Sequence, residues 1–461
     1  MKILILHGLD SVETARRTSL HHAFFLPRHA PGHDYWLQAA SAPVTAELRR
    51  ERFDAILIDT TFLTWRWAGP DVLDAQRRKY AFVRDADAVK IAFPQDEYDH
   101  TALLDEWLSD WRADVVYSVC FDDRAEFYPR TARRAEIRRG YTGLYEPADR
   151  ALAARFARPW RERTIDVGYR AKRLPPWFGW FGALKADIAD RFVDRAAGSG
   201  LRLDISCNLQ DAFMGDDWLR FLGSCRFILG CESGSSLLDA TGSIKECCIA
   251  YGHAHPGATF ADVEAHCFAG QDRARPFKAV SPRLFEAASA GCAQILVPGD
   301  YAGALEPWTH YLPLEADASN IDEVVAAMRD TARMEAMIAA SQEVLLSERF
   351  GYEAYALDVL GAVKARRPGL ADVTAEEPLD GMLRTALANI ERLRHSYDRA
   401  VPRGFMARAL YGGVARAETL AQSVARRSRR IATLLGESWQ ARRLTPLTEA
   451  LARHRNLRRE Q

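Results

Sequence analysis

Short apolar runs alternate with segments of helical periodicity along most of this chain, and this alternation is what most restricts its fold. In the first half, runs rich in Val, Ile, Leu and Phe predict strands at Ile3–Leu6, Ala55–Asp59, Val89–Phe93 and Asp114–Ser118. Helical spacing between the last two runs is set by Leu103, Leu104, Trp107, Leu108 and Trp111. Strand–helix–strand order requires parallel strands with helices on the sheet faces.

The pattern restarts after Pro159–Glu162. New strands are predicted at Thr164–Tyr169, Leu201–Ser206, Arg226–Gly230 and Gln294–Val297, and helices at Asp187–Ala197, Trp218–Leu222, Pro282–Ala290 and Ile321–Arg329. From about Gly361 onward strand signals disappear, and Ala, Leu and Arg dominate. The predicted fold class is therefore α/β: two Rossmann-like domains facing a cleft, over 1–158 and 159–362, followed by a helical Arg-rich tail over 363–461.

Composition places the chain among globular proteins: 461 residues, 48% hydrophobic and 27% charged. No run of 18 apolar residues predicts a membrane-spanning helix. The first apolar run is short and ends at Gly8, which favours a buried first strand over a signal peptide and predicts a cytoplasmic protein. None of the eight cysteines forms a C-x-x-C pair, so free thiols are expected, and the His and Cys residues between 247 and 267 match no zinc spacing.

Charge is distributed unevenly although the whole chain is formally neutral. Residues 391–461 contain 16 Arg and 6 acidic residues, a net charge of +10. Near-helical spacing of Leu420, Val424, Ile431 and Leu435 there, with Arg between them, fits an amphipathic helix on an anionic membrane surface. A helix packed on the protein with a solvated Arg face explains the same pattern.

The most informative segment runs from Lys278 to Gly299. It predicts a helix entry, a short helix, a glycine stop at Gly291 and a buried strand. Ser281 and Pro282 suit the start of that helix, whose first amides can bind a phosphate. Glu286 lies about one turn further on, where its two carboxylate oxygens can accept both hydroxyls of a ribose.

This segment resembles the nucleotide-sugar domain of GT-B-type glycosyltransferases, in the group that includes bacterial surface-polysaccharide transferases and spore-maturation-type proteins. The matching residues are Ser281, Pro282, Arg283, Phe285, Glu286, Ala287 and Gly291. The resemblance implies that Glu286 binds the nucleotide ribose, with Ser281 and Arg283 beside the donor. Many relatives have a glutamate eight residues before that position, where this chain has Lys278, which we expect to neutralise the departing diphosphate.

Two further segments of the second domain are donor-site candidates. Arg170 and Lys172 follow its first strand, and ligands of open α/β sheets lie beyond the carboxyl ends of strands, where cations suit a diphosphate. Gly234 and Ser235 belong to a Gly/Ser-rich loop after another strand, whose free amides can hold a phosphate or a sugar hydroxyl. Solvated loop charges and an ordinary loop are the alternatives.

In the first domain, Asp96 and Glu97 follow a predicted strand and face the cleft in which an acceptor would bind. Either carboxylate can take the proton of an acceptor hydroxyl. The alternative is an N-cap cluster for the helix that begins near Thr101.

These observations predict a metal-independent glycosyltransferase that moves a sugar from a nucleotide-sugar donor to a hydroxyl of a glycan, lipid-linked or protein acceptor. Bacterial surface polysaccharide synthesis is the expected setting. No cofactor and no nucleic-acid partner are expected. The alternative, favoured by Lys278, is a degenerate transferase that binds nucleotide or glycan without turnover, or acts as a scaffold.

Overall fold

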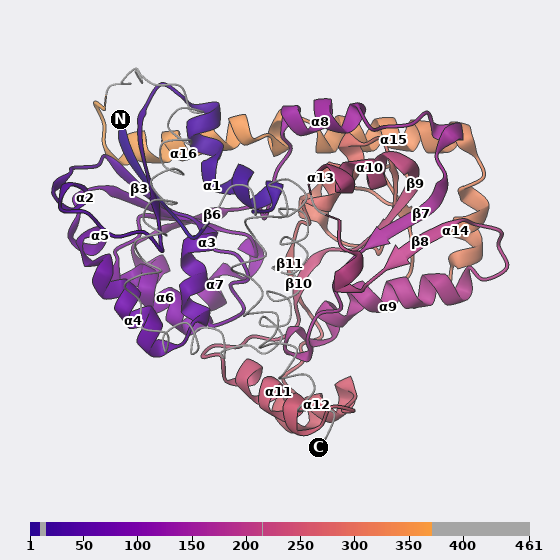
Figure 1. The fold of residues 1–461 in the computed structure, drawn as a ribbon, viewed down its shortest axis with the longest axis horizontal. Helices are drawn as coiled ribbons and strands as arrows, with labels where there is room; N and C mark the ends of the chain where they lie inside the picture. Colours follow the sequence, from indigo (N-terminus) through magenta and orange to yellow (C-terminus); the bar gives the residue numbers. More distant parts are fainter. Residues whose placement is uncertain (10–14, 214, 371–461) are drawn as a thin grey trace, which may run out of the picture. The chain divides into compact units, whose positions relative to one another are not determined.

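A computed structural model describes residues 1–9, 15–213 and 215–370. The predicted α/β fold class is confirmed, because two separate all-parallel sheets are present, one in each half of these residues (Figure 1). The Arg-rich tail beyond residue 370 lies outside the described residues, as does its predicted amphipathic helix. Within the described part, no helix is both long and apolar enough to cross a membrane.

The N-terminal sheet has six parallel strands in the order β2-β1-β3-β4-β5-β6. Four of them are the strands that the sequence predicts. The two edge strands, β2 and β6, are more polar than these four and are not predicted from the sequence. The strand bounds are Lys2–His7 (β1), Asp34–Ala39 (β2), Ala55–Ile58 (β3), Val89–Ala92 (β4), Val115–Ser118 (β5) and Glu136–Arg139 (β6).

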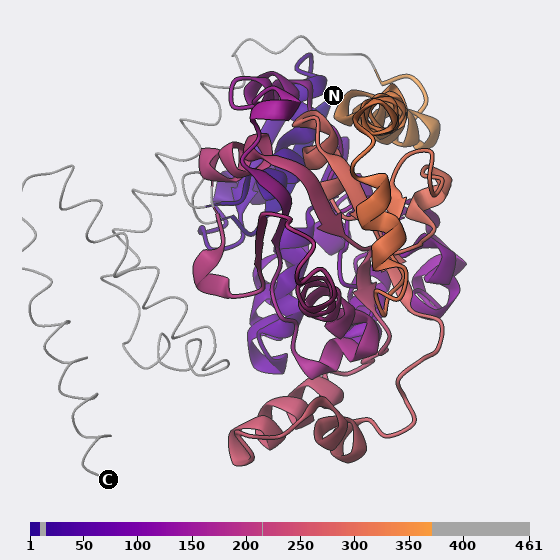
Figure 2. The same ribbon diagram turned by 90° about the vertical axis from the view of Figure 1, so that its right-hand side faces the viewer.

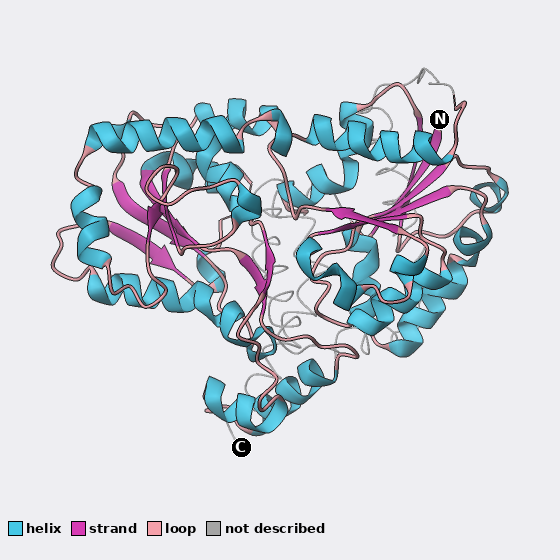
Figure 3. Cartoon of the chain, turned by 180° about the vertical axis from the view of Figure 1, so that it is seen from behind, coloured by secondary structure: helices cyan, strands magenta, loops and turns pink. Residues whose placement is uncertain are grey.

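Helices cover both faces of this sheet (Figure 3). One face packs against α1, and the other against the helices between β2 and β6, where Trp107 and Trp111 are fully buried. The helix bounds are Arg17–His29 (α1), Ala46–Arg50 (α2), Thr60–Leu63 (α3), Pro70–Lys79 (α4), Ala81–Asp85 (α5), Thr101–Asp110 (α6) and Arg124–Phe127 (α7).

The second sheet has five parallel strands in the order β13-β12-β9-β7-β8. Its strands are Ile165–Arg170 (β7), Leu203–Ser206 (β8), Cys225–Gly230 (β9), Ala293–Leu296 (β12) and Leu312–Pro313 (β13). Helices α9, α14 and α15 bury one face, and α8, α10 and α13 bury the other. Their bounds are Pro147–Ala154 (α8), Gly179–Arg195 (α9), Asp216–Ser224 (α10), Arg283–Ser289 (α13), Ile321–Ala327 (α14) and Thr331–Leu345 (α15).

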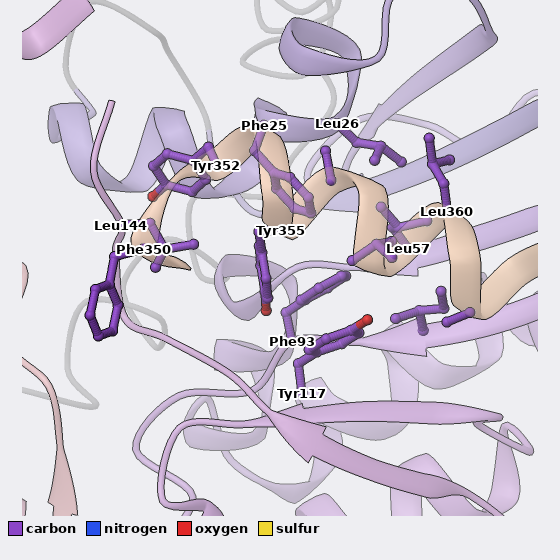
Figure 4. Packing of buried hydrophobic residues seen from close by; sticks show 14 of the residues in the cluster. Phe25, Leu26, Leu57, Phe93, Tyr117, Leu144, Phe350, Tyr352, Tyr355 and Leu360 are labelled. Carbon is purple, nitrogen blue, oxygen red and sulfur yellow. The ribbon is translucent and has the colours of Figure 1, made fainter. Parts of the chain in front are cut away.

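The last described helix, α16 (Tyr352–Arg366), packs against the N-terminal sheet although it follows the second sheet in sequence. Tyr355 lies among Phe25, Phe93 and Tyr117, with ring centroids 5.1 to 6.1 Å apart (Figure 4). Residues 352–362 of the predicted second domain therefore contribute to the core of the first.

A short pair of antiparallel strands also joins the two halves. It pairs β10 (Ser233–Ser235) with β11 (Phe277–Ala279). Phe277 is fully buried in the N-terminal core, 4.9 Å from the Phe127 ring. Asp99 and Asp239 form an isolated backbone bridge between the halves, and the His100 amide donates to the Asp239 carbonyl at 2.7 Å.

Two helices missed from the sequence, α11 (Ser243–Ala254) and α12 (Phe260–Cys267), lie apart from both sheets and share a small core of their own (Figures 1 and 2). Cys247 and Cys267 form a disulfide that joins them. The expectation of free thiols is therefore wrong for this pair, which separate helices bring together across 20 positions of sequence. The other six cysteines are free.

Candidate functional site

A small pocket lies where β7, β9 and β12 end, at the carboxyl edge of the second sheet. Its wall includes Tyr169 from β7, Gly230 and Cys231 at the end of β9, and Gln294 from β12. Lys185, Ser281 and Arg283 also line it. The pocket is thus where an open parallel sheet binds its ligands.

Two cations, Lys185 and Arg283, make the lining of this pocket positively charged. Lys185 Nζ donates to Ser233 Oγ at 3.0 Å and has no ion pair within the described residues. The guanidinium of Arg283, in the first turn of α13, likewise has no ion pair or hydrogen bond among them. Burial lowers the pKa of Lys185 below its ordinary value, and the nearby Arg283 lowers it further. A ligand with several negative oxygens would relieve both the burial cost and the mutual repulsion.

Asp96, in the N-terminal domain, lies close enough for its charge to act on one of these cations, Lys185. Its negative charge acts on Lys185 and raises the pKa of the ammonium group, opposing the larger effect of burial. The residue is partly buried in the left-handed backbone region, at φ 51°, and its Oδ1 accepts from Tyr98 Oη at 2.6 Å. The predicted acid–base candidate is thus coupled electrostatically to Lys185 of the pocket.

Glu286 lies on α13, three residues beyond Arg283. Its Oε2 accepts a hydrogen bond from Trp218 Nε1 at 2.9 Å, and no described residue donates to its Oε1. Burial raises the pKa of Glu286 to about 7, although the Trp218 hydrogen bond and the Arg283 charge oppose this. One carboxylate oxygen therefore stays available to a ligand.

The start of this helix differs slightly from the prediction. Helix α13 begins at Arg283, with Pro282 in the N-cap position and no side-chain cap. Ser281 is not the N-cap. Its hydroxyl-bearing side chain lines the pocket instead, and its carbonyl accepts from the Leu284 amide at 3.2 Å. Gly291 follows the helix at φ 64°, as expected for a glycine stop.

The other cations predicted for the donor do not reach this pocket. The Arg170 guanidinium is held by Asp204 Oδ1 at 2.6 Å and by the Asp211 carbonyl at 3.1 Å, and it lines a separate cavity near the end of β8. The reason is strand alternation, since Tyr169 points to the pocket and its neighbour Arg170 to the opposite face. Lys172 is exposed and does not line the pocket.

Gly234 and Ser235, predicted to hold a phosphate or a sugar hydroxyl, belong to the β10–β11 strand pair, and neither lines the Lys185 and Arg283 pocket. A Cβ on Gly234 would lie 1.9 Å from the Phe277 carbonyl oxygen, so only glycine allows this close strand pairing. Ser235 is fully buried, and its Oγ donates to the Leu237 carbonyl at 3.0 Å. The loop's polar atoms are therefore used to hold its own backbone.

Glu97, predicted to face the cleft, is completely buried. Its Oε1 accepts from Ser118 Oγ at 2.6 Å, Tyr128 Oη at 3.1 Å and the Val119 amide at 3.1 Å, while its Oε2 has no partner. Neighbouring Asp96, itself in the left-handed region, is partly buried and accepts from Tyr98 instead. A substrate cannot reach Glu97, and the N-cap alternative also fails, since no side chain caps α6.

Lys278 lies on β11 and is paired with Glu232, whose Oε2 is 3.1 Å from Lys278 Nζ. The Glu232 carboxylate also accepts from the Tyr301 amide at 2.9 Å. Both side chains line a second, larger cavity and neither lines the Lys185 and Arg283 pocket. The structure therefore does not place Lys278 in the same pocket as Arg283.

Two residues of these sites were missed from the sequence. Lys185 lies in the second turn of α9, and that helix was predicted to begin only at Asp187, so the lysine was not recognised as facing the sheet edge. Glu232 directly follows β9 by two residues, which was a usable signal for a carboxylate at the cleft.

Histidines of the α11 and α12 pair stack instead of converging on a metal. The Tyr251 ring lies 4.3 Å from that of His255 and 4.4 Å from that of His266. A search of the described residues finds no group of three or more His, Cys, Asp or Glu side chains that could hold a metal ion.

Comparisons with known proteins give distant structural likenesses. A scan against protein-family models and a search of curated proteins find no match. Among solved structures, the chain is similar to Anabaena Alr3699/HepE in complex with UDP and glucose (TM-score 0.44, 10% identity, 79% of this chain and 100% of that one). It is also similar to an alpha-glucosyltransferase in complex with UDP-glucose and DNA (TM-score 0.46, 11% identity, 79% and 99%).

A glycosyltransferase from Rickettsia africae is a third neighbour, with a TM-score of 0.43 and 10% identity over 80% of this chain and 99% of that one. These likenesses are too remote to carry an argument. The fold assignment rests on the two parallel sheets, which make the chain a protein of two Rossmann-like domains with a cationic pocket at the carboxyl edge of the second.

Proposed function

We propose that this protein is a glycosyltransferase that binds a nucleotide-sugar donor at the carboxyl edge of its second sheet. The observation that carries the proposal is the pairing of Lys185 and Arg283 in one pocket, with no ion pair to either among the described residues. Arg283 belongs to the segment that resembles the donor domain of such enzymes. The donor's diphosphate supplies the negative charge that this pocket lacks.

The other roles follow from position. Glu286, one turn along the same helix, accepts hydrogen bonds from the ribose hydroxyls through its available oxygen. As the sugar leaves, negative charge builds up on the diphosphate, and Lys185 and Arg283 stabilise it. Asp96, whose charge acts on Lys185, is our candidate for accepting the proton of the acceptor hydroxyl.

We further propose that transfer uses no metal or other cofactor, because two cations already balance the charge of a diphosphate. Activity is then expected to persist in EDTA. Loss of activity that Mg²⁺ or Mn²⁺ restores would contradict this part of the proposal.

A role at the inner face of a bacterial membrane, in surface polysaccharide synthesis, is proposed from the tail's net charge of +10 over residues 391–461. Each Lys or Arg near an anionic surface contributes about 1 kcal/mol, so several together hold a protein there at low salt. Vesicle flotation of the full chain and of a chain ending near Pro402 tests it. Equal recovery of both on anionic vesicles would contradict the proposal.

Turnover tests the proposed reaction. Purified protein is incubated with UDP-, GDP-, CMP- and TDP-linked sugars and a cell-extract acceptor, and the released nucleotide is measured. We expect release with one donor class, and Lys185→Met is expected to reduce it about tenfold to a hundredfold, as the loss of a charge-assisted contact predicts.

Lys172→Met is the matched control, since that lysine is exposed and lies outside the pocket. Its release rate is expected to equal that of the unmodified chain. Donor binding without any acceptor-dependent release would instead favour the non-catalytic alternative.

A further inference from the structure

A second cavity, of about 490 Å³, lies between the two halves of the chain and beside the donor pocket. The N-terminal domain contributes Val119 and the segment 139–141 to its wall, and the second domain contributes Lys278 and Val280. Ser281 and Arg283, further along the same segment, line the donor pocket. One stretch of chain therefore forms a wall of both spaces, and a ligand of the cavity would lie next to the donor.

Every cation in this wall is already paired with a carboxylate. The three ion pairs are Arg139 with Asp122 at 3.0 Å, Arg275 with Asp123 at 3.3 Å, and Lys278 with Glu232 at 3.1 Å. Two of the carboxylates are nearly buried, since Asp123 is 8% and Glu232 5% exposed. A fourth carboxylate in the wall, Asp300, has no ion pair among the described residues. The formal charge of the wall is therefore −1, with no cation left over.

This balance separates the cavity from the donor pocket. An anionic ligand would meet an uncompensated carboxylate and would have to break an existing ion pair to find a cation. A neutral ligand rich in hydroxyl groups meets no such cost, because paired carboxylates and guanidinium groups keep lone pairs and N–H groups for further hydrogen bonds. The Tyr141 ring and the Val119 and Val280 side chains supply apolar surface for the C–H faces of sugar rings.

We propose that this cavity is the acceptor site and that it takes an uncharged glycan in preference to an acceptor carrying phosphate or carboxylate groups. The inference rests on the proposed function, because only a transferase needs an acceptor beside its donor. The cavity's volume lies within the range of roughly 300–1,000 Å³ usual for small-ligand sites.

The test compares neutral and anionic trisaccharides of similar size. Ligand-observed NMR titrations of the full chain use maltotriose, cellotriose and trigalacturonate, with and without a nucleoside diphosphate. At least one neutral trisaccharide is expected to bind at least about tenfold more tightly than trigalacturonate, since like charges at an interface are costly. Failure of both neutral trisaccharides to bind, or equal or tighter binding of trigalacturonate, would overturn the inference.

A charge variant makes the test specific to the cavity. Asp122→Asn frees the Arg139 guanidinium, and both side chains are exposed enough for the fold to tolerate it. Trigalacturonate is expected to bind this variant about threefold to fivefold more tightly than the unmodified chain, the value of one exposed ion pair. Unchanged trigalacturonate binding would show that the cavity is not where the saccharide binds.

Asp190→Asn is the matched control, because it frees Arg173 from a similarly exposed ion pair that does not line the cavity. This control is expected to leave the affinities for the neutral trisaccharides and for trigalacturonate unchanged. The nucleotide titration in the same samples keeps the two proposals apart. Nucleotide binding with the wrong saccharide preference refutes only the acceptor inference, whereas loss of nucleotide binding refutes the donor site.

Discussion

Glu97 and Glu286 are two carboxyl groups whose pKa is raised by burial, but the raised pKa has a different consequence at each position. Burial raises the pKa of each to about 7. Glu97 is enclosed by Ser118 and Tyr128 and reaches no pocket, so its altered pKa bears on stability. Glu286 keeps one oxygen available on α13, the helix that lines the proposed donor pocket, so its altered pKa bears on the proposed binding.

Nucleotide affinity is therefore expected to depend on pH through Glu286. The ionised carboxylate accepts hydroxyl hydrogen bonds more strongly than the neutral acid, so affinity should rise about threefold to tenfold as pH increases through the pKa. Titrations of the bound nucleotide at several pH values, with the chain and with Glu286→Gln, measure this. The variant should show a smaller rise, because the ligand's terminal phosphate ionises in the same pH range with both proteins, and pyrophosphate, which lacks a ribose, should show the same rise with both. Parallel pH profiles for the two proteins would contradict the ribose assignment.

Glu97 is expected to destabilise the fold as the solution becomes more alkaline. Its pKa is about 7 in the folded chain against an ordinary value of 4.5, so folding takes up a proton between these values. That stabilising contribution is complete below pH 4.5 and is lost as pH rises through about 7. Relative to Glu97→Gln, the unmodified chain should lose roughly 3 kcal/mol of unfolding free energy across this range. Urea denaturation of both proteins measures the difference, and a constant difference would contradict the assignment.

At the scale of elements, the sequence predicts buried strands and amphipathic helices well and side-chain direction poorly. The runs that became β1, β3, β4 and β5 are apolar enough to be recognised alone, whereas edge strands β2 and β6 carry polar residues and are not. Of the predicted donor cations, only Arg283, at the start of α13, lines the pocket at the edge of the second sheet. The sequence could not show that Lys185, and not Arg170 or Lys172, lines the pocket. The direction of the Arg170 side chain depends on the alternation of strand β7, and that of Lys185 on where helix α9 begins.

The β10–β11 strand pair is the element that most strictly requires one residue type at one position, glycine at 234. Gly234→Ala would place a Cβ 1.9 Å from the Phe277 carbonyl oxygen and is expected to cost about 1–3 kcal/mol of stability, as overpacking does. Gly361→Ala is the control, since a Cβ there meets nothing within 4 Å and alanine is the better helix former. Chemical denaturation should place the midpoint of the first variant below, and that of the second at or above, the midpoint of the unmodified chain. Equal midpoints for Gly234→Ala and the unmodified chain would mean that the β10–β11 pairing does not contribute to stability.

At the scale of the whole described chain, segments of each half complete the other. Helix α16 adds Tyr352 and Tyr355 to the N-terminal core, and Phe277 of β11 is buried there as well. Arg273 pairs with Glu126 at 2.6 Å across the same junction. The sequence predicted two domains, yet it could not predict these exchanges, because they depend on tertiary contacts between segments far apart in the chain. They hold the donor pocket next to the cavity that we propose for the acceptor.

The central claim is that the pocket holding Lys185 and Arg283 binds the diphosphate of a nucleotide. Isothermal titration of UDP, GDP, CDP and TDP into the full chain tests it most directly, with Arg283→Gln as the variant and Arg173→Gln, an exposed arginine outside the pocket, as its control. At least one nucleotide is expected to bind the unmodified chain, Arg283→Gln to bind it about tenfold to a hundredfold more weakly, and the control to bind it equally well. Binding of no nucleotide, or equal binding by a folded Arg283→Gln variant, would contradict the account.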